Sequence, residues 1–351
     1  MKLLTGKKRK IAVLITSGLG DSLLFVPLLK ELKRKQFNIT CIFYTKHDND
    51  CLFDPGLVDT KVSVTSRFSL LMYAARNFRH FSNFYINQFG KGSIIRLAAQ
   101  VCSRRITQTC HNEENKGSSK RKKQVIDDLS DAEQNLHLLY SESNSKIKNI
   151  NSFYLPDPQA GHRAQNNFIK EGLPYFIIQV SSGNNTTPFK NWPIPNWLIL
   201  IEKLCRTYTN YEFIIVGDST EKIYIQDFES LGHLNCKVLI GKTTVKEIFD
   251  LAAGSIGYIG LDSGIMHMAV ALQKKTFTIF GASNEKLYGY GVLDPVNHKV
   301  ITSNIRCRPC SSWKNPNTSR VSNPMLCPDF ACLSLIEPGL VFEQVTLHFG
   351  L

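Results

Sequence analysis

The segment from Gly260 to His267 reads Gly-Leu-Asp-Ser-Gly-Ile-Met-His and follows a short apolar run. It predicts the end of a strand, a turn of small residues and the start of a helix. The first N–H groups of a helix have no partner within the helix, and they lie at the positive end of its dipole. Such a helix start can bind a diphosphate. The alternative is that Asp262 or Ser263 only caps the helix.

A second phosphate-binding element is predicted at Ser181 and Ser182, which follow the apolar run 175–180. Lys190 lies a few residues further on, just before Asn-Trp-Pro. The carboxyl ends of parallel strands share one edge of a sheet, so both segments are expected to face one ligand. Lys190 would place a positive charge on a phosphate oxygen, although a surface lysine of no special role is the alternative.

The elements that carry these residues alternate between strands and helices. Apolar runs at 11–15 and 38–44 predict strands, and the turn Gly18-Leu19-Gly20-Asp21 opens a helix between them. This order is typical of a doubly wound parallel sheet. A second series predicts strands at 175–180, 212–216, 237–240, 257–260 and 276–280, and helices at 197–208 and 245–253. The polar stretch 112–128 is predicted to be a mobile loop.

Length and composition agree with two folded domains, and we expect boundaries of 1–160 and 161–351. Of the 351 residues, 43% are hydrophobic and 20% charged, and no apolar run is long enough to span a bilayer. The basic start and the apolar run 11–15 imitate a signal peptide, but the glycine turn interrupts the run. The chain is therefore expected to stay in the cytoplasm.

A net charge of +13 predicts an anionic partner, such as nucleic acid, an acidic membrane or a phosphorylated substrate. Two basic runs, Lys7 to Lys10 and Lys120 to Lys123, are interpreted either as solvated surface or as sites of membrane attraction. No helix-turn-helix, zinc-finger spacing or aromatic RNA-binding signature is present, so a nucleic-acid partner is not expected.

An oxidoreductase that uses NAD is a rival interpretation of the first glycine turn. A dinucleotide site needs Gly-x-Gly-x-x-Gly or Ala, but Leu23 stands at the third position. A protein that binds a sugar nucleotide without catalysing a reaction is another rival. The presence of both a carboxylate, Asp21, and a cation, Lys190, that could take part in catalysis disfavours it.

Taken in order, these segments resemble glycosyltransferase family 9, the heptosyltransferases of lipopolysaccharide assembly. The N-terminal marks are the turn 17–21 and Pro27-Leu28-Leu29, and the C-terminal marks are 260–269, Phe280-Gly281-Ala282-Ser283 and 288–291. The signature Lys190-x-Trp192-Pro193 lies where the family has it. The resemblance implies the GT-B architecture, in which two Rossmann-like domains face each other across a cleft.

The resemblance also implies inverting transfer of a sugar from a nucleotide diphosphate, usually ADP-heptose, without a catalytic cofactor or metal. The acceptor would be an anionic lipopolysaccharide core or a related glycolipid, so the enzyme would work at the inner face of the cytoplasmic membrane as a peripheral protein. Family members use more than one nucleotide sugar, so another donor remains an alternative.

By motif position, Asp21 would be the general base on the acceptor hydroxyl. A carboxylate on a turn after a strand points to the ligand side of the sheet, and Gly18 and Gly20 leave room for the acceptor. The alternative is that Asp21 caps the following helix.

The family's donor contacts would fall on seven residues of the second half: Ser181, Ser182, Lys190, Asp262, Ser263, Gly264 and His267. Glu221 would bind the ribose hydroxyls of the donor, and Lys190 with the helix start would stabilise the leaving diphosphate. His267 has a core role as its alternative. Ser263 replaces the family's usual threonine, and three extra residues lie between Ser182 and Lys190.

Four of the ten cysteines cluster near the C-terminus: Cys307, Cys310, Cys327 and Cys332. Four thiolates that begin with a C-x-x-C pair suit a structural zinc or iron site. The gap between Cys327 and Cys332 is longer than in common zinc motifs, so reduced thiols without a metal remain the alternative.

Overall fold

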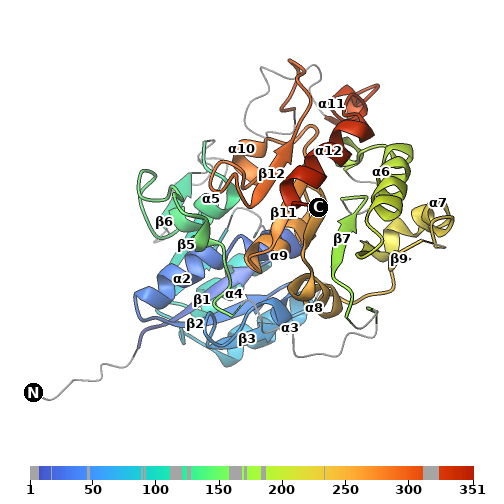
Figure 1. Ribbon diagram of the computed structural model, residues 1–351. Coiled ribbons are helices and arrows are strands. Elements are labelled where there is room, and N and C mark those ends of the chain that lie inside the picture. The colour runs from blue at the N-terminus through green and yellow to red at the C-terminus, as the bar shows by residue number, and fades with distance from the viewer. Residues whose placement is uncertain are drawn as a thin grey trace, which may run out of the picture. The chain divides into compact units, whose positions relative to one another are not determined.

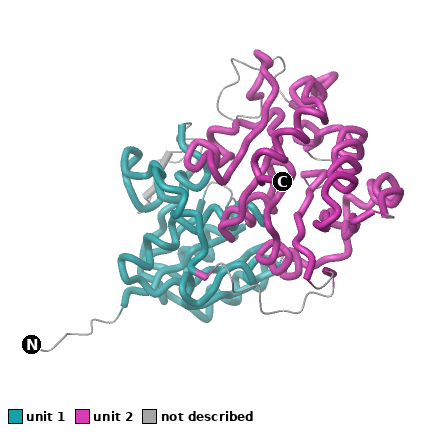
Figure 2. The backbone as a smooth tube through the Cα atoms, viewed as in Figure 1, with its two compact units in different colours: residues 1–156 teal, residues 157–351 magenta. Residues whose placement is uncertain are grey.

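The computed structural model divides the chain into two compact units, Met1–Pro156 and Asp157–Leu351 (Figure 2). It describes residues 8–16, 18–45, 48–87, 90, 92–110, 121–124, 128–157, 168–169, 172–182, 187–232, 234–310 and 324–351. Of the residues singled out above, Lys7, Ser17 and Lys120 lie outside the described residues. None of the described helices is both long and apolar enough to cross a membrane.

The first unit contains a six-stranded parallel sheet in the order β3-β2-β1-β4-β5-β6 (Figure 1). Its strands are β1 (Lys10–Ile15), β2 (Asn38–Phe43), β3 (Thr60–Ser63), β4 (Asn83–Ile86), β5 (Ile106–Cys110) and β6 (Arg121–Gln124). Its helices are α1 (Leu19–Leu23), α2 (Val26–Arg34), α3 (Arg67–Arg76), α4 (Ser93–Cys102) and α5 (Asp131–His137), with short 3₁₀ turns η1 (Asn49–Leu52) and η2 (Ile150–Ser152). The predicted strands 11–15 and 38–44 are confirmed.

The core of this unit explains why its central strand β1 is apolar from Ile11 to Ile15. In β1 every residue from Ile11 to Ile15 is buried, because helices cover both faces of a parallel sheet. Ala12 and Leu14 pack in one cluster with Phe84 of β4 and with buried residues of α3 and α4.

The prediction of a mobile loop over 112–128 is wrong for residues 121–124, which form β6 and pair with β5 from Thr107 to Cys110. The sequence Arg-Lys-Lys-Gln is polar because β6 is the last strand of the sheet. Charged residues are common on edge strands, where they prevent pairing with another chain.

The second unit repeats the same design, with six parallel strands in the order β12-β11-β10-β7-β8-β9. Its strands are β7 (Tyr175–Gln179), β8 (Glu212–Val216), β9 (Cys236–Val238), β10 (Gly257–Leu261), β11 (Lys275–Ile279) and β12 (His298–Ile301). Its helices are α6 (Ile194–Thr207), α7 (Ile225–Glu229), α8 (Val245–Gly254), α9 (Gly264–Ala271), α10 (Glu285–Tyr288), α11 (Ala331–Ser334) and α12 (Pro338–Phe349). Three 3₁₀ turns complete it: η4 (Pro188–Lys190), η5 (Ser219–Tyr224) and η7 (Pro324–Leu326). All five predicted strands of this half and both predicted helices are present.

In each unit the chain starts with a central strand, adds two strands on one side and then crosses to the other side. The first and fourth strands of each unit are therefore neighbours, β1 with β4 and β7 with β10. This is the Rossmann-like strand order, and ligands bind where the order reverses, beyond the carboxyl ends of the strands. The predicted α/β fold class with two Rossmann-like units is confirmed.

Candidate functional site

The point of reversal in the second unit brings together the two predicted phosphate-binding segments. Ser181 and Ser182 follow β7, while Asp262 and Ser263 follow its neighbour β10. Ser181, Asp262 and Ser263 are all buried, so polar side chains are held inside the protein at this edge of the sheet. Burying a polar group costs free energy unless the group has a hydrogen-bonding partner. Several polar side chains buried together with their partners are typical of a binding site.

Lys190 joins this group through an ion pair. Its ammonium lies 2.7 Å from Oδ2 of Asp262. Burial raises the pKa of the Asp262 carboxyl, but Lys190 and His267 outweigh this effect, and the pKa lies below its usual value. Asp262 is therefore ionised, and Lys190 keeps a quarter of its side chain exposed at the site.

Ser263 is the N-cap of α9, with its Oγ accepting a hydrogen bond from the N–H of Met266 (3.4 Å). The capping alternative therefore holds for Ser263. The same hydroxyl contacts Tyr258 (3.1 Å) and donates to the side-chain carbonyl of Gln179 at the end of β7. The tyrosine hydroxyl also donates to the backbone carbonyl of Leu261 (2.8 Å). These bonds fix the start of α9 and leave Gly264 at its first helical position, where backbone N–H groups remain for an anion.

His267 lies on α9 and is buried, with its Nδ1 2.6 Å from the hydroxyl of Tyr290. Burial lowers the pKa of His267 to about 4, although the nearby Asp262 opposes this effect. The imidazole is therefore neutral at physiological pH. Its burial agrees with the core alternative, while its proximity to Asp262 keeps it at the edge of the candidate site.

Ser182 is held by Asn191 from the other side of the loop. The Asn191 side-chain carbonyl accepts from the N–H (2.9 Å) and the hydroxyl (3.0 Å) of Ser182. The Ser182 hydroxyl also lies 2.8 Å from that of Thr187. Its side chain thus stabilises the segment that leads to Lys190. Residues 183–186, which belong to the stretch with the three extra residues, lie outside the described part of the chain.

Glu221 lies in η5, beyond the carboxyl end of β8, and is 1% exposed. Its carboxylate accepts from the backbone N–H of Asp218 (3.1 Å) and forms a capping box with that residue. A Cβ atom at Gly217 would lie 1.9 Å from this carboxylate, so a larger residue there would displace the Glu221 side chain. The capping role is visible here, and ribose binding stays a prediction.

Arg308 is a residue that the sequence analysis did not single out. Its guanidinium donates to the backbone carbonyls of Gly281 (3.0 Å) and Ser283 (3.3 Å) and pairs with Glu285 (3.0 Å). Its side chain is 8% exposed. Arg308 therefore holds the loop after β11, and Ser283 of that loop is one of the groups that lower the pKa of Asp262.

In the first unit, Asp21 lies at the corresponding place beyond β1. It is the third residue of α1, whose N-cap is Gly18, so Asp21 is not the cap of this helix. The next residue, Ser22, is buried and donates to the Gly18 carbonyl (2.8 Å), while Asn49 donates to its hydroxyl (2.9 Å). Asp21 is partly exposed, and nothing lies within 4 Å of a side chain placed at Gly18.

The four clustered cysteines line one small cavity of about 10 Å³. Burial raises the pKa of the Cys332 thiol to about 12, and the other three thiols lie near enough to affect it. Cys310 donates to the carbonyl of Cys307 (2.8 Å), and its N–H donates to the carbonyl of Ala282 (2.8 Å). Within the described ranges, no group of three or more His, Cys, Asp or Glu side chains lies close enough to hold a metal ion. The donor chemistry fits a metal, while the thiols as placed do not enclose one.

Comparison with known proteins identifies the chain. Residues 118–319, more than half of its length, match the model of glycosyltransferase family 9 (heptosyltransferase). No curated protein sequence matches it. Its fold is similar to that of the ADP-heptose lipopolysaccharide heptosyltransferase II of E. coli, at 18% identity and a TM-score of 0.70, with 97% of this chain and 98% of that one covered.

Two further solved structures share this fold. The E. coli heptosyltransferase WaaC, solved with ADP, is 15% identical with a TM-score of 0.65, and the alignment covers 97% of this chain and 99% of that one. The iron-containing dodecameric glycosyltransferase TibC of enterotoxigenic E. coli is 13% identical with a TM-score of 0.59, covering 97% and 76%. The chain is a glycosyltransferase and belongs to family 9, the heptosyltransferase family.

Proposed function

We propose that this enzyme transfers heptose from ADP-heptose to a hydroxyl of an anionic glycolipid, a lipopolysaccharide core or a related acceptor, with inversion at the anomeric carbon. The observation that carries the proposal is the group formed by Lys190, Asp262 and the start of α9 at the reversal point of the second sheet. A cation beside free helix N–H groups is suited to the diphosphate of the donor.

In this mechanism the acceptor hydroxyl attacks the anomeric carbon while its proton passes to the carboxylate of Asp21. The new glycosidic C–O bond forms as the bond from the anomeric carbon to the diphosphate oxygen breaks. The electron pair leaves with the nucleoside diphosphate, whose added charge Lys190 and the α9 N–H groups stabilise. Such stabilisation of developing charge is often the largest contribution to catalysis.

The other predicted donor contacts are assigned by their place around this group. Ser181 and Gly264 would contact the diphosphate through backbone N–H groups, and Glu221 would accept hydrogen bonds from the ribose. Ser182, whose N–H is bonded to Asn191, would line the same site from the loop after β7. His267 is neutral, so it would contribute a hydrogen bond rather than a charge.

We further propose that the acceptor remains anchored in the membrane and that the enzyme binds the inner face of the cytoplasmic membrane as a peripheral protein. The net charge of +13 supports attraction to an acidic surface. Sedimentation with phosphatidylglycerol vesicles should fall as salt is raised, and salt-independent sedimentation or none at all would contradict the proposal.

The four cysteines are proposed to hold a structural zinc or iron ion. The similar enzyme TibC is iron-containing, and four thiols that share one cavity are the donor set that zinc and iron prefer. Such an ion would tie residues 307–310 to the segment 327–332 and would take no part in sugar transfer.

Thermal unfolding in the presence of ADP, GDP, UDP or NAD tests the donor. A ligand at about 100 times its Kd adds roughly 2.7 kcal/mol to the free energy of unfolding. Selective stabilisation by ADP is expected, followed by transfer activity with ADP-heptose. Stabilisation by GDP or UDP would change the donor, and stabilisation by NAD alone would overturn the proposal in favour of an oxidoreductase.

A further inference from the structure

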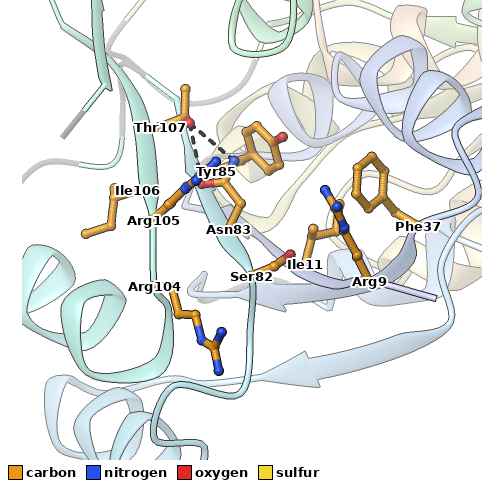
Figure 3. A pocket seen from close by; sticks show the side chains of 10 residues that line it. All are labelled: Arg9, Ile11, Phe37, Ser82, Asn83, Tyr85, Arg104, Arg105, Ile106 and Thr107. Atoms are coloured by element: carbon orange, nitrogen blue, oxygen red, sulfur yellow. Dashed lines mark hydrogen bonds between the residues drawn. The ribbon is translucent and has the colours of Figure 1, made fainter. Parts of the chain in front are cut away.

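A groove lies at the amino ends of β1, β4 and β5 in the first unit, on the opposite edge of the sheet from Asp21. Its volume is about 540 Å³, and Figure 3 shows the side chains that line it, among them Arg9, Asn83, Tyr85, Arg104, Arg105 and Thr107. A second concave region of about 630 Å³ shares part of this lining and adds Lys8, Lys10, Phe78, Arg79, His80 and Phe81.

The lining is strongly basic. Three segments supply exposed cations: residues 8–10, Arg79, and the pair Arg104 and Arg105. No acidic residue occurs among the described residues that line either region. The sequence itself contains no Asp or Glu between Asp59 and Glu113. This concentration of like charge is unfavourable in the free protein, and an anion would relieve it.

None of the three arginines in the groove forms an ion pair with a carboxylate of the described chain. The three arginines of the described chain that do form ion pairs, Arg34, Arg206 and Arg308, each have a glutamate at 3.0 Å or less. The ammonium of Lys10 lies 3.0 Å from Nε2 of His80, and burial, followed by the charge of Lys10, lowers the pKa of His80. The guanidinium groups of Arg9, Arg104 and Arg105 are thus available to a ligand.

The backbone beneath these cations is fixed. The turn before β4 and the turn before β5 are joined by hydrogen bonds from Arg79 N–H to the Val101 carbonyl (2.9 Å) and from Arg104 N–H to the Phe81 carbonyl (3.1 Å). The hydroxyl of Ser103 bonds the carbonyls of Ala99 (2.7 Å) and Arg105 (2.9 Å). A site on a fixed backbone loses little entropy when it binds a ligand.

Neutral polar and aromatic groups line the rest of the groove. Asn83 donates to the hydroxyl of Thr107 (3.2 Å), and Figure 3 shows this pair beside Arg105 and Tyr85. The hydroxyl of Ser82 lies at the same end of β4, bonded to the Lys10 carbonyl (2.9 Å). Such groups bind hydroxyls and ring faces, as in small-molecule sites of 300–1,000 Å³.

We propose that this groove is a second anion-binding site, which takes a ligand carrying one or more phosphate groups. Arginine is suited to this role because its planar guanidinium makes two parallel hydrogen bonds to a phosphate. The ligand is either a soluble phosphate ester or the headgroup of an anionic phospholipid. The site does not depend on the proposed sugar donor, since it lies in the other unit.

Hydrogen exchange followed by mass spectrometry tests the site, because each peptide reports its own region. Inorganic pyrophosphate is expected to slow exchange in peptides covering 78–85 and 103–107. In the double variant Arg104→Gln/Arg105→Gln, the concentration for half-maximal protection should rise about tenfold or more, as two charged hydrogen bonds are lost. The matched control, Arg76→Gln/Arg96→Gln, removes two exposed arginines of the same unit outside the groove and should behave like the wild type.

Vesicles of phosphatidylcholine with or without phosphatidylglycerol identify the source of the phosphate. Protection of the same peptides by pyrophosphate supports a soluble ligand, and protection only by phosphatidylglycerol vesicles supports a lipid headgroup. No protection by either, or equal protection in the two double variants, would overturn the site. Protection of donor-site peptides by ADP is read separately, so failure here is distinct from failure of the proposed function.

Discussion

The ammonium of Lys190 lies 2.7 Å from the carboxylate of Asp262, and the two residues come from segments that follow neighbouring strands, β7 and β10. The pair therefore joins the two sides of the reversal point before any donor arrives. Lys190 is held by an acid that is 4% exposed, so its position is set in advance and part of its charge is already balanced. Electrostatic groups that are fixed in advance need no rearrangement during the reaction.

Replacing Lys190 with alanine is expected to affect both stability and turnover. Asp262 would remain as a buried charge without its cation, and because Lys190 is partly exposed we expect a loss of about 2 kcal/mol, below the ~3–5 kcal/mol of a fully buried pair. Turnover should fall about 10²–10³-fold as the leaving diphosphate loses its cation. Chemical denaturation and single-turnover assays measure the two effects. Lys286→Ala, an exposed lysine of the same unit, should change neither, and wild-type turnover in Lys190→Ala would contradict the role.

Replacing Asp21 with alanine should leave ADP binding intact and lower turnover by ~10²–10⁴-fold, because a general base contributes about that much. Calorimetry with ADP and a transfer assay separate the two quantities. Asp48→Ala removes another exposed carboxylate of the first unit and serves as the control. Turnover of Asp21→Ala at the wild-type rate would show that a group other than Asp21 takes the proton of the attacking hydroxyl.

His267 predicts a pH dependence of stability. Its pKa is about 4 in the folded protein and about 6.5 when unfolded, so the unfolded chain binds more protons between these values. The free energy of unfolding should therefore rise as the pH increases through this window, and the contribution of His267 should be lost as the pH falls through it. From pH 7 to pH 5 the loss is about 2 kcal/mol for this residue.

The variant His267→Gln isolates this contribution, since glutamine cannot titrate. Its denaturation midpoint should change less between pH 7 and pH 5 than that of the wild type. Burial also lowers the pKa of His298 to about 4, so His298 adds a pH dependence of the same sign to the stability of both proteins. The test is therefore the difference in pH dependence between His267→Gln and the wild type. An unchanged pH slope in His267→Gln would show that the imidazole titrates normally.

Arg308 is expected to act as a positioning residue. Arg308→Gln removes the bonds to Gly281, Ser283 and Glu285, so the loop beside Asp262 should loosen and the KM for the donor should rise by about tenfold with a smaller change in kcat. Arg308→Lys should recover part of the loss. Arg306→Gln, two residues earlier and exposed, is the control. A fall in kcat alone would indicate a direct role in the chemistry instead.

The cysteine cluster makes a prediction about metal content. Purified protein should contain about one zinc or iron ion per chain by elemental analysis, and Cys307→Ser/Cys310→Ser should contain none. Removal of the metal should lower the melting temperature while ADP still binds, because the ion is structural. If the double variant had the same melting temperature and metal content as the wild type, the result would show that the four cysteines do not hold a metal and are reduced thiols.

Five of the six strands of the second half could be predicted because each is a short, mainly apolar run, which is typical of a parallel sheet covered on both faces. β12, with the sequence His-Lys-Val-Ile, has too few apolar residues to give this signal. β8 has the predicted bounds Glu212–Val216. β6 was missed because an edge strand is stabilised by backbone bonds from one neighbour and does not need apolar side chains.

The partners within the site could not be predicted in the same way. Gln179 and Ser263 are far apart in sequence, and Arg308 reaches back to the loop after β11, so these contacts exist only once the sheet has formed. The position of Arg308 inside the Cys-x-x-Cys segment draws attention to that segment. However, nothing in the neighbouring sequence indicates which carbonyl groups Arg308 binds.

Each unit has a hydrophobic cluster of its own, drawn from residues 12–106 in one and 176–345 in the other. Both sheets also follow one strand order, with Asp21 after the first strand of one and Ser181 after the first strand of the other. In the proposed mechanism the first unit binds the acceptor and the second binds the donor, so substitutions in residues 1–156 could change the acceptor without altering recognition of the nucleotide. Chimeras that exchange halves between family members at Pro156 should for the same reason inherit donor preference from the C-terminal parent.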